Sequence, residues 1–341
     1  MIKIFEHAVF VTPKKLSSYI GDPINRNRTL IALRLPPEKF HFLAYSREKK
    51  FASHISLLTM NKTWPLRLYR FKPDIIHTKL NPSCLRSLRV ARLANKKVKH
   101  VTSVHGMPET WRIEPKHVKA IEKLIAAADV VHSVSQTTAR EIEEKWGLPS
   151  FVIYNGVDTN LFSPRKEPND PENLRVLYVG RLVSHKHPEI VVQLAKDFPD
   201  LKFTMIGQGE MHQEIADQIQ RLSNITLTSV SYGEMPRIYR DHDIFLFPSV
   251  HEGLSNAILE AIASGLPILA RNATSMAEII RDGHNGYLCE DFEAFEERLR
   301  DLIGNINELQ HMSSNARSTA LKFDWDEIVN EYETFFESLV L

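Results

Sequence analysis

Short apolar runs alternate with amphipathic stretches along the first half of the chain. Stretches with helical periodicity, such as 83–94 and 115–128, separate the runs. Strands that alternate with helices are typical of a parallel sheet covered by helices on both faces. The pattern predicts one such α/β domain, with strands at residues 2–11, 40–46, 74–80, 99–106, 129–135 and 151–156.

The same alternation starts again in the second half. Strands are expected at 175–182, 202–209, 224–230, 243–249 and 266–271, and helices at 188–198, 209–222 and 255–265. Ser255 or Asn256 is suited to cap the last of these helices and Gly265 to end it. From about Asp291 the chain is predicted to be helical to its end. We therefore expect an α/β fold of two Rossmann-like, doubly wound domains facing across a cleft, with ligands beyond the carboxyl ends of the strands.

The length of 341 residues also favours two domains, because a single core rarely supports so long a chain. The hydrophilic segment 163–174 contains three prolines and is the best candidate for a linker. We expect one domain over residues 1–165 and a second over 166–320.

Charge divides the chain in the same way. Residues 1–165 carry 28 Lys and Arg against 13 Asp and Glu, a balance of +15, whereas residues 166–341 carry 15 against 29, a balance of −14. A basic domain attracts anionic partners, although opposite charges could also serve to hold the two halves together. The basic half lacks interleaved aromatic residues, so we expect no nucleic-acid partner.

One amphipathic stretch concentrates this positive charge. Residues 83–97 place Arg86, Arg89 and Lys96 along one side of a helix, with Arg92 close by. Such a helix suits an anionic membrane surface or an anionic acceptor. The alternative is a helix packed on the sheet through its leucines, with a solvated basic face; those leucines are Leu85, Leu88 and Leu93.

The cysteines and the apolar runs of the sequence indicate the cellular compartment. The two cysteines, Cys84 and Cys289, have no metal-type spacing and are expected to be free thiols in a reducing compartment. The chain has no run of about 18 apolar residues and no signal-peptide profile at its start. We therefore expect a cytoplasmic protein, which the basic half could hold at the inner face of a membrane.

The ends of the predicted strands in the second half carry candidate chemistry. Gly180 ends a strand and is followed by Arg181 and Lys186, two cations suited to a diphosphate. Gly207 and Gly209 follow the next strand, where the absence of a side chain lets a ligand approach the backbone. The amides of Asn256 and Ala257 would point out of a helix N-terminus, where phosphate binds readily.

Two glutamates complete this pattern. Glu252 precedes the helix and Glu260 lies inside it. An ionised carboxylate only accepts hydrogen bonds and therefore suits hydroxyl groups. A ligand with a diphosphate between two polyols, a nucleotide sugar, would satisfy the cations and the carboxylates together. Taken singly, each glutamate could be an ordinary surface acid.

Several segments together resemble the retaining GT-B glycosyltransferases of family 4. They are NGVDTNLF (155–162), YVGRLVSHK, MIGQGE, DIFLFPSVHEGLSNAILEAIASGLPILA and DGHNGYL, and the two glutamates match the family's E-x7-E motif. The resemblance implies a nucleoside diphosphate sugar bound mainly by residues 166–320. Arg181 and Lys186 would contact the diphosphate, Glu252 the sugar, Glu260 the ribose and the backbone at Val230 the base. The implied donor site also includes Gly180, Gly207, Gly209, Leu254, Ser255, Asn256 and Ala257.

The resemblance is weaker in the first half. SVHGMPE matches a strand-end His-Gly, which would bring His105 over the donor sugar; the alternative is a core histidine at a strand end. The domain 1–165 would bind the acceptor, and residues 321–341 would form a helix that crosses back to it. The family's first Gly-Gly loop is absent, which leaves Gly21 and Asp22 as acceptor-side candidates. A later Gly-Gly is replaced at Ser275 and Met276, so the sugar is not specified.

The resemblance implies a retaining hexosyltransferase, and because Arg181 and Lys186 can take the place of a metal ion, we expect it to be metal-independent and without a cofactor. A UDP-sugar is favoured over a GDP-sugar, and the acceptor is a hydroxyl of a glycan or a lipid-linked molecule. The D-x-D strings at 241–243 and 324–326 are not at predicted strand carboxyl ends, so we expect no metal site there. Alternatives are a sugar-nucleotide 2-epimerase of the same architecture and a non-catalytic nucleotide-sugar-binding protein. A dinucleotide-dependent dehydrogenase is disfavoured because GQGE lacks the third glycine of that fingerprint.

Overall fold

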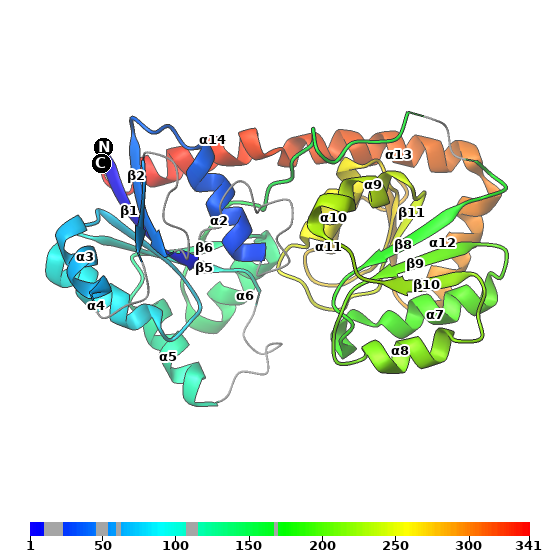
Figure 1. The fold of residues 1–341 in the computed structure, drawn as a ribbon, viewed down its shortest axis with the longest axis horizontal. Helices are drawn as coiled ribbons and strands as arrows, with labels where there is room; N and C mark the ends of the chain where they lie inside the picture. The colour runs from blue at the N-terminus through cyan, green and yellow to red at the C-terminus, as the bar shows by residue number, and fades with distance from the viewer. Residues whose placement is uncertain (10–22, 46–53, 59–62, 107–114, 167–169) are drawn as a thin grey trace. The chain divides into compact units, whose positions relative to one another are not determined.

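The computed structural model describes residues 1–9, 23–45, 54–58, 63–106, 115–166 and 170–341. The chain forms two compact units (Figure 1). Unit 1 comprises Met1–Asn155 and Trp325–Leu341, and unit 2 comprises Gly156–Asp324. Gly21 and Asp22, the acceptor-side candidates, lie outside the described residues.

Unit 1 is built on a parallel sheet of seven strands. Its order is β3 (Ile55–Leu58), β2 (Phe40–Tyr45), β1 (Ile2–Val9), β4 (Ile75–Lys79), β5 (Lys99–Val104), β6 (Val130–Ser133) and β7 (Ser150–Val152). Neighbouring residues of β1 face opposite sides of the sheet, so Ile4 packs in one hydrophobic cluster and Phe5 in another. Both faces of this sheet are therefore buried.

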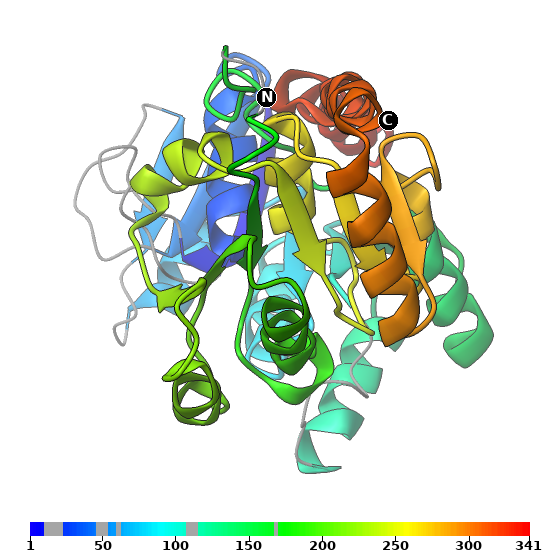
Figure 2. The ribbon, with the colours of Figure 1, turned by 90° about the vertical axis from the view of Figure 1, so that its right-hand side faces the viewer.

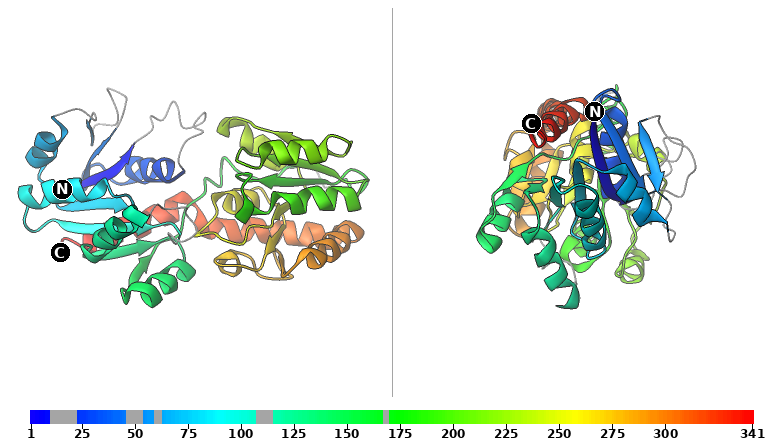
Figure 3. Two further views of the ribbon diagram at one scale, coloured as in Figure 1. Left: turned by 90° about the horizontal axis from the view of Figure 1, so that it is seen from below. Right: turned by 90° about the vertical axis from the view of Figure 1, so that its left-hand side faces the viewer.

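Helices cover both faces of that sheet. The cluster around Ile4 includes residues of α2 (Pro23–Arg34) and α14 (Trp325–Ser338), and the cluster around Phe5 includes residues of α3 (Trp64–Phe71) and α4 (Cys84–Ala94). Helices α5 (Pro115–Ala126) and α6 (Gln136–Trp146) complete the described part of the unit. Because α14 belongs to unit 1, both chain termini lie at the same end of this unit (Figure 3).

Unit 2 repeats the design with six parallel strands. Their order is β10 (Ile225–Thr228), β9 (Lys202–Ile206), β8 (Arg175–Val179), β11 (Ile244–Phe247), β12 (Ile268–Arg271) and β13 (Gly286–Cys289). Helices α7 (Pro188–Asp197), α8 (His212–Ile219) and α12 (Phe292–Gly304) share one hydrophobic cluster with the sheet (Figure 2). The other helices are α9 (Met235–Arg240), α10 (Asn256–Ala263), α11 (Met276–Ile279) and α13 (Ile306–Ala320).

The two-domain α/β fold predicted from the apolar pattern is confirmed. Elements β3, β13 and α2 are short or weakly patterned and were not predicted. Gly265 does follow α10 with a left-handed φ of 76°. Cys84 and Cys289 are free thiols, and both are buried.

The domain limits differ from those expected. The first boundary falls between Asn155 and Gly156 instead of at residue 165, and the last helix begins at Trp325 instead of at residue 321. The expected linker 163–174 lies inside unit 2, where Arg165 donates a hydrogen bond to the carbonyl oxygen of His242 at 2.7 Å. A hydrophilic, proline-rich segment therefore packs against one unit instead of joining two.

The alternative for helix α4 was a helix packed on the sheet through its leucines, and the structure differs from it at one leucine. Leu88 is buried against the sheet, whereas the side chain of Leu93 is 74% exposed. Among the helices of the described ranges, none is long and apolar enough to cross a membrane.

Candidate active site

The cations and carboxylates predicted in unit 2 lie on loops at the carboxyl ends of β8 and β11. Arg181 follows Gly180 at the end of β8, and Lys186 ends a 3₁₀ turn, η2 (Ser184–Lys186). Glu252 lies five residues after the end of β11. Parallel strands bring their carboxyl ends to one edge of the sheet, which is why residues so distant in sequence meet here.

Lys186 and Glu252 form an ion pair. Their side chains are 12% and 13% exposed, and the Lys186 ammonium lies 5.2 Å from the ring centroid of Phe247. Burial, and then the positive charge of Arg181, lower the pKa of Lys186 to about 7, while the contact with Glu252 acts in the opposite direction. Arg181 beside it is exposed.

A strained loop after β12 holds Glu252. Its backbone N–H donates to Thr274 Oγ1 at 3.2 Å, and Ser275 Oγ donates to the Glu252 carbonyl at 3.4 Å. Thr274 has a φ of 47°, which is unfavourable for a β-branched residue. Ser275 and Met276 were singled out from the sequence, but the strained residue is their neighbour Thr274.

Helix α10 begins where the sequence analysis expected it. Ser255 occupies the N-cap position with extended backbone, but its hydroxyl makes no capping hydrogen bond. Leu254 and Ser255 are each 8% exposed, and Asn256 and Ala257 form the first turn. The first amides of a helix have no partner within it and carry a partial positive charge, so this turn suits a phosphate.

Glu260 lies one turn further along α10 and is 7% exposed. Tyr232 donates to its Oε1 at 3.1 Å, and Tyr239 donates to its Oε2 at 3.2 Å. Tyr232 belongs to the 3₁₀ turn η3 (Tyr232–Glu234), two residues beyond the half-buried Val230. Neither tyrosine was predicted as a site residue, because nothing in the spacing of SYGEMPRIY relates them to α10.

The glycines after β9 have a structural role. A Cβ atom on Gly207 would lie 1.9 Å from the carbonyl oxygen of Gly180, and one on Gly209 would lie 2.2 Å from that of Leu182. The missing side chains leave room for protein backbone, and Leu182 N–H donates to the Gln208 carbonyl at 3.0 Å. Gly207 and Gly209 thus hold the loop that carries Arg181.

His105 lies in unit 1, directly after β5. Its Nε2 atom is buried and has no hydrogen-bond partner among the described residues. Burial, followed by the charge of Arg28 and the neighbouring histidines, lowers the pKa of His105 well below its usual value, so the ring is neutral at pH 7. It lines a cavity of about 10 Å³, together with Asn27, Arg28 and Tyr332.

Behind His105, polar side chains form a continuous chain of hydrogen bonds. His132 Nε2 lies 3.2 Å from the Ile153 carbonyl oxygen and donates its proton there, because a carbonyl only accepts, and Tyr332 Oη lies 3.3 Å from the same nitrogen. His132 Nδ1 lies 2.7 Å from Ser103 Oγ. Ser103 donates to His77 Nε2 at 2.5 Å, and His77 Nδ1–H donates to Glu6 Oε1 at 2.7 Å. The chain ends on a carboxylate.

An arginine neutralises that carboxylate. Arg28 donates to Glu6 Oε2 at 3.0 Å, and their side chains are 2% and 3% exposed. Burial would raise the pKa of Glu6, but His77 and Arg28 outweigh it and lower the pKa. Burial and Arg28 lower the pKa of His77. The charged groups are thus Glu6 and Arg28, and His77 is neutral.

The D-x-D strings have structural partners. Asp243 pairs with Arg165 and accepts a hydrogen bond from Arg175 N–H at 2.8 Å, whereas Asp241 pairs with Arg237. Asp324 accepts a hydrogen bond from the Thr159 hydroxyl. These aspartates cap strands and helices.

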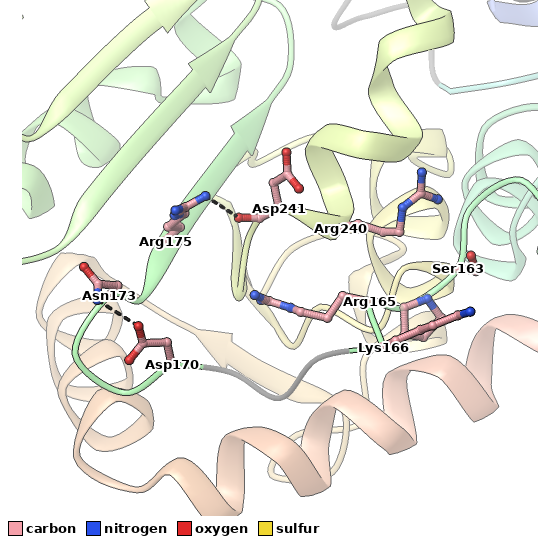
Figure 4. Close-up of a pocket in the computed structure, with 9 residues that line it drawn as sticks. Ser163, Arg165, Lys166, Asp170, Asn173, Arg175, Arg240 and Asp241 are labelled. Carbon is pink, nitrogen blue, oxygen red and sulfur yellow. Dashed lines mark hydrogen bonds between the residues drawn. The ribbon is translucent and has the colours of Figure 1, made fainter.

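A cavity of about 550 Å³ lies at the amino ends of strands in the unit 2 sheet, opposite to the carboxyl ends that carry Arg181 and Glu252 (Figure 4). It opens beside Arg175, the first residue of β8, and Asp241, which precedes β11. Two of its cations have partners nearby, since Arg165 pairs with Asp243 and Arg175 donates to the Asp241 carbonyl at 3.5 Å. The cavity is therefore separate from the residues predicted to bind the donor.

Two family models match successive parts of the chain. The model described as Glycosyltransferase Family 4 matches residues 25–161, and the model described as Glycosyl transferases group 1 matches residues 160–319. Together they cover both units apart from the ends of the chain.

Similar proteins agree with these models. An uncharacterized glycosyltransferase of Methanocaldococcus jannaschii is 25% identical over 276 residues, which are 78% of this chain and 76% of that protein. An Escherichia coli protein named UDP-Gal:alpha-D-GlcNAc-diphosphoundecaprenol alpha-1,3-galactosyltransferase is 28% identical, over 73% of this chain and 68% of its own.

Among solved structures, Anabaena HepE in complex with UDP and glucose superimposes with a TM-score of 0.78 over 99% of this chain and 100% of its own, at 18% identity. This likeness establishes the fold, a GT-B arrangement of two Rossmann-like units. The model of glycosyl transferases group 1 covers Lys186, Glu252 and Glu260. The two models, the relatives and the fold together place the chain in glycosyltransferase family 4.

Proposed function

We propose that the protein transfers a hexose-type sugar from a nucleoside diphosphate sugar to a hydroxyl of a glycan or lipid-linked acceptor. The observation that carries the proposal is the ion pair between Lys186 and Glu252, which joins the loop after β8 to the loop after β11. Its ammonium suits phosphate oxygens, and its carboxylate suits sugar hydroxyls.

Donor binding would exchange this ion pair for contacts with the ligand. A diphosphate beside Lys186 raises the pKa of the ammonium toward its usual value and keeps it charged. Glu252, released from Lys186, accepts hydrogen bonds from the sugar hydroxyls.

In the transfer step, the bond from the anomeric carbon to the diphosphate oxygen breaks, and a bond to the acceptor oxygen forms. The diphosphate keeps the electron pair, and one of its oxygens takes the acceptor's proton. Arg181 and Lys186 stabilise the charge that develops on the leaving group. No carboxylate is assigned as a nucleophile, and we propose that the anomeric configuration is retained.

We propose that this reaction needs no metal ion or other cofactor, because the two cations meet the charge of the diphosphate directly. Turnover should therefore be the same with EDTA as with added Mg²⁺ or Mn²⁺. A strict need for a divalent cation would show that Arg181 and Lys186 are not sufficient.

A neutral His105 would act as a hydrogen-bonding group for the donor sugar. Because burial keeps its ring uncharged, it can bind a hydroxyl but cannot neutralise a phosphate. His105→Ala should weaken transfer without changing the affinity for UDP alone. Equal losses in both measurements would place His105 in a structural role.

A UDP-sugar is the favoured donor. HepE was solved with UDP and glucose, and the name of the Escherichia coli relative gives UDP-Gal as donor and a diphosphoundecaprenol-linked acceptor. These names belong to those proteins and support the choice for this chain by likeness.

A donor panel tests the proposal. The protein is incubated with UDP-glucose, UDP-galactose, UDP-N-acetylglucosamine or GDP-mannose, with and without a diphosphoundecaprenol-linked sugar, and products are identified by mass. Acceptor-dependent release of UDP is expected, and Lys186→Ala should reduce it about a hundredfold. The matched control is Lys196→Ala, an exposed lysine of α7.

The outcomes separate the alternatives. A changed sugar nucleotide without acceptor would indicate a 2-epimerase, and binding without any conversion would indicate a non-catalytic protein. Full activity of Lys186→Ala would contradict the proposed site.

A lipid-linked acceptor gives a reason for membrane contact. Helix α3 exposes Leu66, Tyr69 and Arg70, and α4 exposes Arg86, Arg89 and Leu93. Residues three or four apart share a helix face, so each helix presents apolar and basic side chains together. We propose that this α3–α4 face rests on anionic lipid at the inner side of the membrane.

Liposome flotation tests this contact. The protein should float with vesicles that contain phosphatidylglycerol and should remain below with pure phosphatidylcholine. The double variant R86E/R89E should lose flotation, whereas the control Lys196→Glu should keep it. Flotation that is the same with both lipids, or that survives R86E/R89E, would rule this face out.

A further inference from the structure

Two cavities of unit 2 adjoin each other. The cavity of about 550 Å³ in Figure 4 shares two lining residues, Arg175 and Asp241, with a second cavity of about 420 Å³. The second cavity follows strands β9 and β10, where Lys202, Thr204 and Thr226 line it. None of the described residues that line either cavity belongs to the predicted donor site, so the two cavities together form a separate groove.

This groove is basic although unit 2 is acidic. Residues 156–324 carry 16 Lys and Arg against 25 Asp and Glu, a balance of −9. Among the described lining residues of the two cavities, which we call the basic groove, cations outnumber carboxylates by six to two. The cations are Arg165, Lys166, Arg175, Lys202, Arg237 and Arg240, and the carboxylates are Asp170 and Asp241. Positive charge gathered in a unit of the opposite charge favours an anionic ligand.

Most of these cations are not neutralised by a carboxylate. Arg165 pairs with Asp243, and Arg237 pairs with Asp241. The other four cations form no ion pair within the part of the chain that the structure describes, and three of them, Lys166, Arg175 and Lys202, are exposed. An anion can therefore reach them without displacing an acidic side chain of the protein.

Hydroxyl groups line the part of the groove that follows the sheet. Thr204 of β9 pairs with Thr226 of β10, and Thr228 lies two residues further along β10. Their neighbours Phe203 and Ile225 pack in the hydrophobic cluster on the other face, so the threonines face away from it. Parallel sheets usually have both faces covered, but here Thr226 is exposed and Thr204 and Thr228 are half-buried.

The lining of the groove suits a glycan better than other polyanions. Its described residues offer no exposed aromatic ring, because Phe203 and His242 are buried, so nucleic-acid bases have no ring on which to stack. Ile206 is buried as well, which leaves little apolar surface to anchor a peptide. Hydroxyl groups beside arginine and lysine suit sugar hydroxyls and the acid groups attached to them.

We propose that the basic groove binds an anionic oligosaccharide, a chain of sugars that carry carboxylate or phosphate groups. Arg175 and Lys202 pair with the acid groups, and the threonines of β9 and β10 bond to sugar hydroxyls. The inference goes beyond the proposed function, since the groove shares no residue with the predicted donor site. It binds the oligosaccharide with or without a nucleotide.

Calorimetric titration of the full chain with tetragalacturonate, which carries a carboxylate on each sugar, and with neutral maltotetraose tests the inference. At low salt, tetragalacturonate should bind about tenfold more tightly than maltotetraose. This preference should disappear in about 1 M salt, which screens exposed charges. Saturating UDP should leave the preference unchanged.

Variants connect the preference to the groove. R175A/K202A should bind tetragalacturonate about as weakly as maltotetraose. The matched control K196A/R221A removes two exposed cations of unit 2 outside the groove and should keep the preference. Thr226→Val removes a hydroxyl without a change of charge and should weaken the binding of both sugars a few-fold. The thermal midpoint of each variant checks its folding.

Several results would overturn the proposal. They are equal binding of the two sugars by the wild type, an unchanged preference in R175A/K202A, and tighter binding of oligoglutamate or oligothymidylate than of tetragalacturonate. The last would assign the groove to an acidic peptide or to a nucleic acid. If R175A/K202A does not fold, Lys202→Glu at the same exposed edge decides, because a preference that survives it contradicts the proposal. The proposed function depends separately on the binding of UDP or GDP.

Discussion

The two units place polar residues in similar sheets but use them differently. In unit 1, Glu6, Arg28 and His77 are almost fully buried and bond to one another, and in this trio Arg28 Nε has no hydrogen-bond partner among the described residues. In unit 2, Lys186 and Glu252 are partly accessible, and Arg181 beside them is exposed. The comparison teaches that a closed polar network supports a fold, whereas a site for a ligand keeps some of its hydrogen-bonding capacity unused.

The largest difference between the units should appear in their stability at acidic pH. Burial lowers the pKa of His132 to about 3 and that of His100 to about 4. Unfolded histidines bind protons below pH 6.5 and these folded ones do not, so stability is lost as pH falls from 6.5 toward 4. Each histidine contributes about 1.4 kcal/mol per pH unit in this window.

Tryptophan fluorescence measures this loss in unit 1 alone, because all four tryptophans of the sequence fall within its residues. The acid midpoint should move downward in His100→Gln, and the exposed His311→Gln in unit 2 is the control. An acid transition that is unchanged in His100→Gln would show that the buried histidines do not set it.

Breaking the charged pair of unit 1 should lower the free energy of unfolding nearly as much as acid does. Arg28→Ala leaves Glu6 buried without its cation, which should lower the free energy of unfolding by about 3–5 kcal/mol. Arg34→Ala on the same helix loses a surface contact with Asp326 at 3.9 Å and should cost less than about 1 kcal/mol. Urea unfolding followed by fluorescence compares the two, and equal costs would contradict the closed network.

In unit 2, a change to the charged pair of Lys186 and Glu252 should appear in the activity. The pKa of Lys186 is about 7, so kcat/KM for the donor should fall about tenfold per pH unit once the ammonium loses its proton. Arginine stays charged over this range, and Lys186→Arg should therefore move the basic limb of the profile to higher pH. Lys196→Arg is the control, and an unmoved limb in Lys186→Arg would assign it to another group.

The strained loop should give the smallest effect. Thr274→Gly relieves the positive φ and should stabilise unit 2 by about 1 kcal/mol, but it removes the hydroxyl that holds Glu252 N–H. Hydrogen exchange of unit 2 and the donor KM report the two consequences, and KM should rise a few-fold. Thr274→Ser keeps the hydroxyl and should keep KM; a raised KM in that variant would show that the hydroxyl is not responsible.

The sequence predicted what depends on local pattern. Alternating apolar runs identified most strands, and strand-end positions identified Arg181, Lys186 and Glu252 as neighbours. The segment 163–174 was misplaced because its composition resembles a linker, and composition does not show that Arg165 pairs with Asp243.

Tertiary contacts account for the residues that were missed. Tyr232 and Tyr239 reach Glu260 across 28 and 21 positions, and no periodicity relates such distant residues. The chain of histidines was equally hidden, because His77 and His132 occupy strand positions that look like interruptions in an apolar run. Their role depends on cross-strand packing.

The most direct test of the central claim is a crystal structure of the protein grown with UDP-glucose. The account predicts that the diphosphate lies within hydrogen-bonding distance of Arg181 and Lys186, that Glu252 has left Lys186 for the sugar, and that the ribose meets Glu260. A nucleotide bound elsewhere, with the pair between Lys186 and Glu252 intact, would contradict the account.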